Sequence, residues 1–411
     1  MIALKDAQEI LLRQLEHLVP KNNNLQQIAL WNAGGRVLAK DIIAVENFPA
    51  FDRSLVDGFA LAAEDAIGAT AEKTVTLAVK DEVAAGSDVV NKLIPHTATR
   101  IFTGAPLPLG ADCVVKQEEV LETTGSCNEQ MIQIMQPPKK GEGVGYKGED
   151  IAAGELLINA GTILTAAHLG VLATLGVDPV PVFKQPVVGV FSTGNELIEV
   201  DSHLRPGKLR ASNIYVLSEI IRRAGGVPIN LGIVPDSVEE VIKIYEEAER
   251  RAIPLVVSTG GTASGDYDVI KEAMDRFSAQ RLFNKVAIRP GAPVVVSVKP
   301  KQLLIGLSGN PGGATVAMLI LVYPLIAGLA GARRCLQRYQ ALLEQPIHYK
   351  SSFCSYFWGS YRQEGSTIIV RPLENQFCGS IKNYANSNCL IEVPGGKNIM
   401  NNEPVAILTL P

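Results

Sequence analysis

The stretch that most constrains the fold is residues 255–270, LVVSTGGTASGDYDVI. It begins with Leu255, Val256 and Val257, which are apolar and partly β-branched, as in a strand that is covered on both faces. A turn of small residues follows, and residues 269–277 have helical character. Glycines in such a turn let backbone N–H groups approach an anion without a Cβ in the way. Because a helix start favours negative charge by about 0.3–1 kcal/mol, the stretch predicts a phosphate-binding turn after a buried strand.

Two aspartates, Asp266 and Asp268, follow the glycines of this turn. Two carboxylates beside a phosphate predict a bridging Mg²⁺, because this ion prefers oxygen ligands. A strand-to-helix loop with a solvated cap explains the same residues. The spacing alone does not choose between the two interpretations.

Composition narrows the class of protein. A chain of 411 residues predicts two to four domains, and 47% hydrophobic residues supply a packed core. The net charge of −4 argues against a general nucleic-acid binder. The six cysteines form no CxxC pair and the start MIALKD does not resemble a signal peptide, so we expect free thiols in a reducing cytoplasm. The five histidines are scattered, which predicts no histidine metal site.

Residues 311–332 carry no charge and are long enough to span a bilayer. Pro324 interrupts this segment, four glycines dilute it, and the sequence contains no second segment of this kind. We therefore expect a helix that is buried behind a sheet, and no membrane partner.

The order of patterns along the chain predicts an α/β multidomain protein. Residues 4–18 repeat apolar positions at three- and four-residue steps, which predicts an amphipathic helix. Short strand-like runs fill residues 74–134 and 340–411, which predicts two small β-rich domains, the second a barrel or sandwich. The predicted domains are an N-terminal helical and linker domain, a small β-rich domain, an α/β domain and a C-terminal β domain, at residues 1–47 with 148–185, 48–147, 186–335 and 336–411.

From Pro186 onward, strands alternate with helices, which predicts a doubly wound and mainly parallel sheet. In such sheets ligands bind outside the carboxyl ends of the strands. Glu196, Asp236, Asp268 and residues 308–311 all follow predicted strands. We expect these loops to converge on one binding site.

Six motifs occur along the chain in a fixed order: FPAFDRSLVDGFAL, RIFTGAPLP, KGEDIAAG, FSTGNEL, STGGTASGDYD and GLSGNP. With them the chain resembles the molybdopterin molybdenumtransferases, a family that includes the bacterial enzyme and the carboxyl-terminal part of gephyrin. The resemblance implies four domains in an elongated homodimer, with a cleft that the two subunits share. It implies a reaction in which molybdate is inserted into adenylylated molybdopterin and AMP is released, with Mg²⁺ required. Implied partners are the molybdopterin adenylyltransferase and the molybdoenzymes.

The resemblance also implies roles for individual residues. The catalytic positions it implies are Asp57, Thr103, Asp150, Glu196, Asp236 and Asp268. Of these, Asp236, Asp268 and Glu196 are the expected ligands of Mg²⁺. The expected substrate-binding residues are Ser258, Gly260, Gly261, Thr262, Lys285, Arg289, Ser308, Asn310 and Pro311.

The chain departs from the family pattern at several positions. Ala292 replaces a lysine, Gly313 replaces a serine and Asn195 replaces an aspartate that is frequent in the family. Ser308 replaces a proline, and the arginines that often surround Phe357 are absent. Together these changes remove cations and a hydroxyl that could hold an oxyanion.

Three functions are consistent with this sequence. The first is the molybdenum-inserting transferase. The second is the adenylyltransferase that makes its substrate, which shares the α/β domain type but lacks the additional domains expected here. The third is a non-catalytic pterin-binding or scaffold paralogue, which the lost cations favour and the retained acids Asp57, Glu196, Asp236 and Asp268 oppose.

Overall fold

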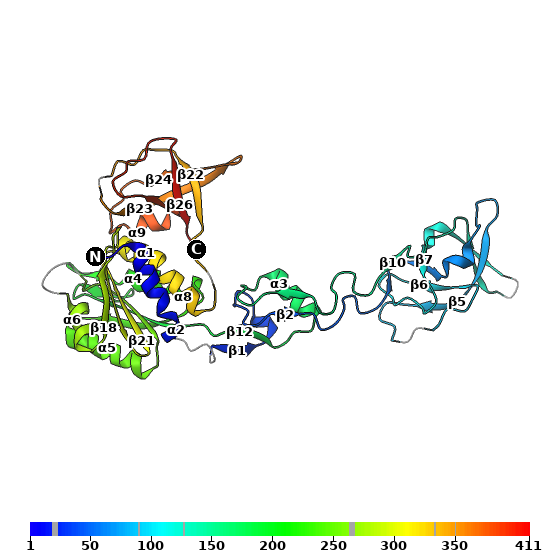
Figure 1. The fold of residues 1–411 in the computed structure, drawn as a ribbon, viewed down its shortest axis with the longest axis horizontal. Coiled ribbons are helices and arrows are strands. Elements are labelled where there is room, and N and C mark those ends of the chain that lie inside the picture. The colour runs from blue at the N-terminus through cyan, green and yellow to red at the C-terminus, as the bar shows by residue number, and fades with distance from the viewer. Residues whose placement is uncertain (19–23, 89–90, 126–127, 263–267, 333, 350) are drawn as a thin grey trace. The chain divides into compact units, whose positions relative to one another are not determined.

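The protein is described by a computed structural model that covers residues 1–18, 24–88, 91–125, 128–262, 268–332, 334–349 and 351–411. The chain forms two compact units, which are shown in Figure 1. Unit 1 contains Met1–Lys40, Ala160–Thr165 and Pro179–Pro411, and unit 2 contains Asp41–Asn159 and Ala166–Asp178. The expected four-domain boundaries and the elongated shape stay predictions.

A six-stranded sheet is the centre of unit 1, in the order β16-β13-β17-β21-β20-β18. The first four strands are parallel to one another, while β20 is antiparallel to both β21 and β18. The mainly parallel sheet is therefore confirmed, and β18 is a strand that the sequence patterns did not predict. The strands are β13 (Val187–Thr193), β16 (Val227–Val234), β17 (Leu255–Thr259), β18 (Gln280–Lys285), β20 (Pro293–Lys299) and β21 (Gln302–Leu307).

Helices cover both faces of this sheet (Figure 1). The side chains of Leu255 and Val257 pack with α4 and with the helical segment that begins at α7, whereas Val256 packs with α5 and α6. Alternate residues of β17 thus point into two different cores, which explains why the strand has no polar face. The helices are α4 (Ser212–Arg223), α5 (Val238–Arg250), α6 (Val269–Arg276), α7 (Pro311–Ala317), η5 (Met318–Val322) and α8 (Tyr323–Leu329).

The uncharged segment forms a helix behind the sheet, as expected. Pro311–Leu329 is apolar and long enough to cross a membrane, and 89% of its most apolar window is buried inside the protein. Its central part, η5, is a π-helix. The Gln8 side-chain amide donates a hydrogen bond of 3.1 Å to the Ile320 carbonyl in this part. A polar side chain of the N-terminal helix therefore satisfies a backbone group of the irregular turn.

The N-terminal residues belong to the same packed core. The amphipathic segment forms two helices, α1 (Leu4–Arg13) and α2 (Leu15–Leu18), with a break at Gln14. Ala7 and Leu11 are buried in the core cluster that also contains residues of α4 and α8. The predicted helix is thus confirmed, and one wall of the α/β core is made by the start of the chain.

The C-terminal part of unit 1 is a closed barrel. Strand β23 pairs with both β24 and β25, which closes the ring through β22 and β26. Of the two predicted alternatives, the barrel is therefore correct. A short strand, β19 (Ile288–Arg289), pairs with the start of β23, and α9 (Ile381–Ala385) follows the barrel loop at residues 373–380. The barrel strands are β22 (Arg338–Leu343), β23 (Cys354–Glu364), β24 (Thr367–Pro372), β25 (Cys389–Val393) and β26 (Pro404–Thr409).

Unit 2 contains the expected small β-rich fold, with strand order β7-β4-β6-β5-β9-β8. Its core includes Phe59, Leu61 and Ile132, which are fully buried. These strands are β4 (Gly58–Leu61), β5 (Val75–Val83), β6 (Thr97–Ile101), β7 (Cys113–Lys116), β8 (Val120–Thr124) and β9 (Gln130–Ile134). The unit also has α3 (Ala166–Thr174), η3 (Ala63–Ala66) and η4 (Gln117–Glu119).

Short strand pairs complete both units. Unit 1 has β1 (Leu25–Ile28) with β12 (Val180–Phe183), β14 (Leu197–Ile198) with β15 (Leu209–Arg210), and the turn η2 (Leu30–Asn32). Unit 2 has β2 (Ile42–Ile43) with β11 (Leu156–Ile158), and β3 (Arg53–Ser54) with β10 (Val144–Gly145).

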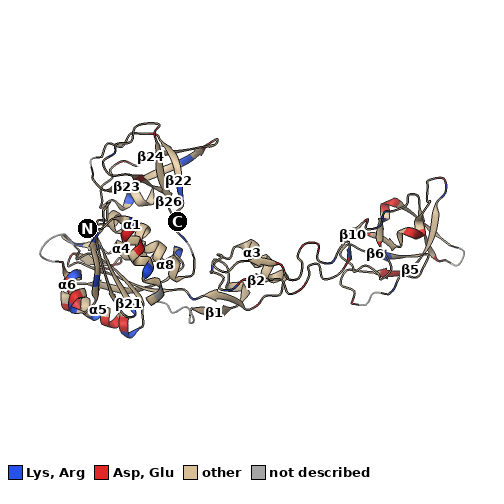
Figure 2. Ribbon diagram, viewed as in Figure 1, with Lys and Arg blue, Asp and Glu red and all other residues tan. Residues whose placement is uncertain are grey.

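Charge is distributed as the sequence pattern predicts for an outer helix. Figure 2 shows acidic and basic residues along α5, where Lys243 pairs with Glu240 at 2.6 Å. Surface pairs of this kind contribute about 0–1 kcal/mol each, so buried contacts such as those of Tyr245 hold the helix in place.

Leu11 tests the packing of the N-terminal helix. Leu11 is 1% exposed and Leu12 is 44% exposed. We expect Leu11→Ala to lower the free energy of unfolding by about 2–4 kcal/mol, because it removes buried methyl groups and leaves a cavity. The control Leu12→Ala should change it by less than about 0.5 kcal/mol. Urea unfolding followed by the fluorescence of buried Trp358 measures both, and equal effects would contradict the packing.

Candidate active site

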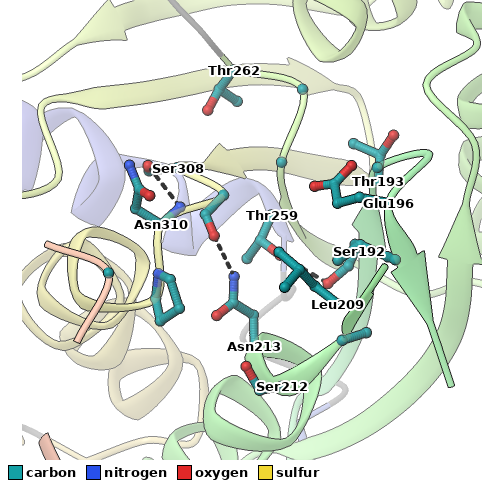
Figure 3. A pocket seen from close by; sticks show the side chains of 18 of the residues that line it. Ser192, Thr193, Glu196, Leu209, Ser212, Asn213, Thr259, Thr262, Ser308 and Asn310 are labelled. Atoms are coloured by element: carbon teal, nitrogen blue, oxygen red, sulfur yellow. Dashed lines mark hydrogen bonds between the residues drawn. The ribbon is translucent and has the colours of Figure 1, made fainter. Parts of the chain in front are cut away.

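The carboxyl ends of the parallel strands open on a cavity of about 780 Å³ in unit 1. Loops after β13, β16, β17 and β21 all contribute to its walls, as the sheet topology requires. Figure 3 shows Thr193 and Glu196 on one wall, with Ser308 and Asn310 on another. The expected convergence of separate loops is therefore present. The predicted site residues in this cavity are Glu196, Asp236, Gly260, Gly261, Thr262, Ser308, Asn310 and Pro311.

The Asp236 carboxylate is held in a fixed orientation. Thr193 Oγ1 donates to one of its oxygens at 2.7 Å, and the Asn195 backbone N–H donates to the other at 3.3 Å. The Asp236 N–H in turn donates to Asn195 Oδ1 at 3.2 Å. Because each carboxylate oxygen accepts more than one bond, both oxygens keep capacity for a cation. Asn195, a departure from the family pattern, thus fastens the loops after β13 and β16 to each other.

The Glu196 carboxylate lies over the backbone of Gly194. A Cβ at Gly194 would stand 2.8 Å from either carboxylate oxygen, so a side chain there would displace the carboxylate from this position. Glu196 is exposed and lines the same cavity as Asp236. The two acids are therefore available to one ligand.

The glycine turn after β17 passes unusually close to the loop after β13. Gly260 has φ +92°, and a Cβ there would lie 2.0 Å from the Thr193 carbonyl oxygen. Thr262 Oγ1 donates to the Leu307 carbonyl at 3.1 Å, which ties this turn to β21. On another side, Asn213 Nδ2 donates to the Gly309 carbonyl at 2.9 Å (Figure 3). The cavity is thus lined by braced loops whose glycines leave backbone groups accessible.

Asp268 is placed differently from the other two expected metal ligands. It is the N-cap of α6, where its side chain accepts the Lys271 N–H at 2.9 Å. Burial raises the pKa of this carboxyl above its ordinary value. Asp268 is not among the residues that line the cavity, and Asp266 lies outside the described residues. Within the described ranges, no group of three or more His, Cys, Asp or Glu residues could hold a metal ion.

Three further predicted residues lie apart from this cavity. Ser258 is buried within β17, and Lys285 ends β18 on the surface. Arg289 lines a second cavity of about 460 Å³, where it is the one charged residue among the described lining residues. Ala292 and Gly313, two departures from the family pattern, line the same cavity. The lysine and the serine hydroxyl that they replace are therefore missing from the walls of this second cavity.

Unit 2 brings Asp57 and Thr103 together. One oxygen of the Asp57 carboxylate accepts both the Thr103 N–H at 2.7 Å and the Thr103 hydroxyl at 2.8 Å. These bonds, the backbone one first, lower the pKa of Asp57. The next residue, Gly58, permits the close approach of β4 to β7, because a Cβ there would meet the Val115 carbonyl oxygen at 1.9 Å. Asp57 is exposed, so it is an ionised carboxylate that a ligand can reach.

Two other acids of unit 2 lie beside backbone hydrogen bonds that join separate segments of the chain. Asp52 accepts the Lys147 backbone N–H at 2.8 Å, so its carboxylate joins two segments that are distant in sequence. Asp150 is exposed, and its backbone N–H donates to the Phe48 carbonyl at 3.2 Å. Its predicted catalytic role stays a prediction.

Comparisons with known proteins agree with the motifs. Residues 2–176 match the MoeA N-terminal region (domain I and II), residues 189–328 a probable molybdopterin binding domain, and residues 340–410 the MoeA C-terminal region (domain IV). The molybdopterin molybdenumtransferase of Staphylococcus epidermidis is 33% identical over 399 residues, which cover 96% of this chain and 92% of that protein. The chain belongs to the molybdopterin molybdenumtransferase family. The members of this family are enzymes of molybdenum cofactor biosynthesis, as the motifs predicted.

Further similar proteins support the membership. The Bacillus subtilis molybdopterin molybdenumtransferase is 33% identical over 380 residues, covering 92% of this chain and 87% of its own. The crystal structure of a molybdopterin biosynthesis moeA protein from Pyrococcus horikosii has a TM-score of 0.85 and 29% identity, and the match covers 100% of this chain and 99% of that one. The expected fold class is confirmed by this likeness.

Sequence reasoning missed several residues that line this cavity or orient its acids. Thr193, which orients Asp236, stands inside the FSTGNEL motif, where only Glu196 and the departure Asn195 were considered. Arg210 and Phe377 also line the cavity. Phe377 comes from the barrel, and no local pattern connects residues so far apart in the sequence.

The pKa of Asp57 tests the contact with Thr103. We expect Thr103→Val to raise this pKa toward the ordinary carboxyl value, because the hydroxyl bond is lost while the backbone bond remains. A lowered pKa means that the contact stabilises the fold above the ordinary value of 3.8 and ceases to do so as pH falls through the lowered value. Carboxyl NMR titration measures the shift. The control Thr76→Val, at an exposed threonine of β5, should leave the pKa of Asp57 unchanged.

Proposed function

We propose that this chain inserts molybdate into adenylylated molybdopterin and releases AMP in a reaction that requires Mg²⁺. The observation that carries the proposal is the cavity at the strand ends, where Glu196 and Asp236 share the walls with the glycine turn after β17. Its volume of about 780 Å³ lies in the range of about 300–1,000 Å³ that small-molecule sites occupy. Carboxylates and accessible backbone N–H groups are what a phosphate-linked substrate with a divalent cation requires.

The donor set fits Mg²⁺. This ion usually takes one or two carboxylates from the protein and completes its shell with phosphate oxygens and water. Asp236 and Glu196 supply two carboxylates, and Thr193 holds the first of them in place. When bound, Mg²⁺ supplies charge neutralisation for the phosphates of the substrate.

The chain's own residues would position the substrate for cleavage of its phosphate link. Phosphoryl transfer depends mainly on positioning and on neutralisation of charge. Gly261 and Thr262 would contact the phosphates through backbone N–H groups, as in other glycine-rich anion sites. The Gly260 N–H donates to the Leu307 carbonyl at 3.2 Å, so Gly260 would contact the substrate as a lining residue without a side chain. Arg210 adds a cation to the same walls. The remaining substrate-binding assignments, Ser258, Lys285, Arg289, Ser308, Asn310 and Pro311, and the catalytic assignment of Asp150, stay part of this proposal.

The proposed assembly is a homodimer in which Asp57 and Thr103 of one subunit serve the cavity of the other. The family resemblance implies such a shared cleft, and the exposed, ionised carboxylate of Asp57 suits it. The proposed location is the cytoplasm, because the described cysteines are free thiols. The proposed partners are the molybdopterin adenylyltransferase, which makes the substrate, and the molybdoenzymes that receive the product.

Asp236 and Asp268 test the metal assignment. We expect Asp236→Asn to abolish Mg²⁺-dependent AMP release from adenylylated molybdopterin with molybdate, because a neutral amide does not replace a carboxylate ligand. Asp268 caps α6 outside the cavity lining, so its predicted role as a third ligand has a separate test: if it serves the metal ion, Asp268→Asn also abolishes AMP release with the fold intact, since asparagine caps a helix as well as aspartate does. The control Asp201→Asn changes an exposed acid that lines no described cavity. Wild-type turnover in either variant would refute that residue's role.

Mixed dimers test the shared cleft. Asp57→Asn and Asp236→Asn subunits are co-expressed with different tags and purified through both tags. If each site takes Asp57 from one subunit and Asp236 from the other, one of the two sites in the hybrid has both acids, and AMP release should return to about half of the wild-type rate. Hybrids as inactive as the single variants would show that each site is built within one subunit.

A further inference from the structure

The barrel loop at residues 373–380 presents an aromatic side chain at the junction of the two cavities. Phe377 lines both of them and is 68% exposed. The two cavities also share Pro293, Ser308 and Asn310 as lining residues. A large exposed apolar side chain in a concave polar site points to contact with a ligand.

The loop that carries Phe377 is braced on both sides. The Gln376 side chain donates to the Trp358 carbonyl at 2.9 Å and accepts the Trp358 N–H at 2.9 Å, so it is pinned to β23. The Asn383 amide donates to the carbonyls of Glu374 and Asn375 at 3.0 and 2.9 Å, so α9 holds the other side. These bonds fix the backbone around Phe377 before any ligand binds. Binding of a ligand against Phe377 therefore costs little further conformational entropy of this loop.

The same loop is joined to the start of α7. The Gly312 N–H donates to the Cys378 carbonyl at 2.8 Å, and a Cβ at Gly312 would stand 2.7 Å from that oxygen. Glycine lets the loop approach the cavity wall, which brings Phe377 beside Ser308 and Asn310 as a lining residue.

The second cavity has an aromatic wall. Tyr349 and Phe357 line it with their rings 5.2 Å apart in an edge-to-face arrangement, and Tyr356 lines it as well. Arg289 is the one charged residue among its described lining residues. Such a wall suits a flat heteroaromatic ring better than a free oxyanion.

We propose that Phe377 stacks against one heteroaromatic ring of the substrate at the junction of the two cavities. The inference rests on the proposed function, since an adenylylated pterin carries one ring on each side of its phosphates. With the phosphates at the glycine turn of the first cavity, one ring lies against Phe377. Adenine and pterin share the flat π face that a phenyl ring contacts, so the experiment distinguishes them.

Direct binding tests the stacking without turnover. AMP and a free pterin are titrated by calorimetry into wild-type protein and into Phe377→Ala, with Mg²⁺ present and molybdate absent. We expect Phe377→Ala to weaken binding of one of the two probes by about tenfold, as loss of base stacking does. Phe377→Trp should retain the affinity. A loss for AMP alone assigns adenine to Phe377, and a loss for pterin alone assigns the pterin ring.

Two controls exclude a general effect. Ribose 5-phosphate has no aromatic ring, so its binding should be the same in wild type and Phe377→Ala. Tyr339→Ala removes another exposed aromatic of the barrel, which lines neither cavity, and should leave all affinities unchanged. Unchanged AMP and pterin binding in Phe377→Ala, an equal loss for ribose 5-phosphate, or no binding of either ring to the wild type would each overturn the inference. Ring-dependent binding without AMP release would support it and refute the proposed function.

Discussion

The close approach of Gly260 to the Thr193 carbonyl is the contact on which the site depends. With a positive φ and only 2.0 Å between a Cβ position and that oxygen, no side chain fits at residue 260. The contact lets the loops after β13 and β17 meet where parallel strands would otherwise diverge through twist. Thr193 then serves two purposes, because its carbonyl faces Gly260 and its hydroxyl orients Asp236. One backbone contact thus places the glycine turn and the acidic wall against the same ligand.

A second set of backbone contacts joins the α/β sheet to the barrel. Gly312 faces the Cys378 carbonyl, and a Cβ at Gly291 would stand 2.7 Å from the Gly313 carbonyl. Both glycines lack the side chain that would occupy this space, so three backbone segments pack directly against one another. Ala292 and Gly313 line the second cavity beside these contacts, so two of the positions that depart from the family pattern adjoin the junction of sheet and barrel.

Sequence patterns predicted those elements whose burial can be read from the spacing of their apolar residues. The apolar run of β17 and the spacing of α5 are explained by burial on two faces and on one face, respectively. Strand β18, with the sequence QRLFNK, was missed because it is half exposed and mostly polar, and only pairing with β20 makes it a strand. Asp268 shows a further difficulty, since an acid at a helix start suits a cap and a metal ligand equally well in sequence.

The charges of the first cavity connect its two ligands to each other. Glu196 and Asp236 face it with Arg210 as the one cation among its described lining residues, so the walls alone are net acidic and would repel a phosphate. A divalent cation reverses this balance, and a bound phosphate in turn completes the oxygen shell that two carboxylates leave open. With the proposed function, binding of the metal ion and binding of the nucleotide-linked substrate are therefore coupled. By thermodynamic linkage, each must raise the affinity for the other by the same factor.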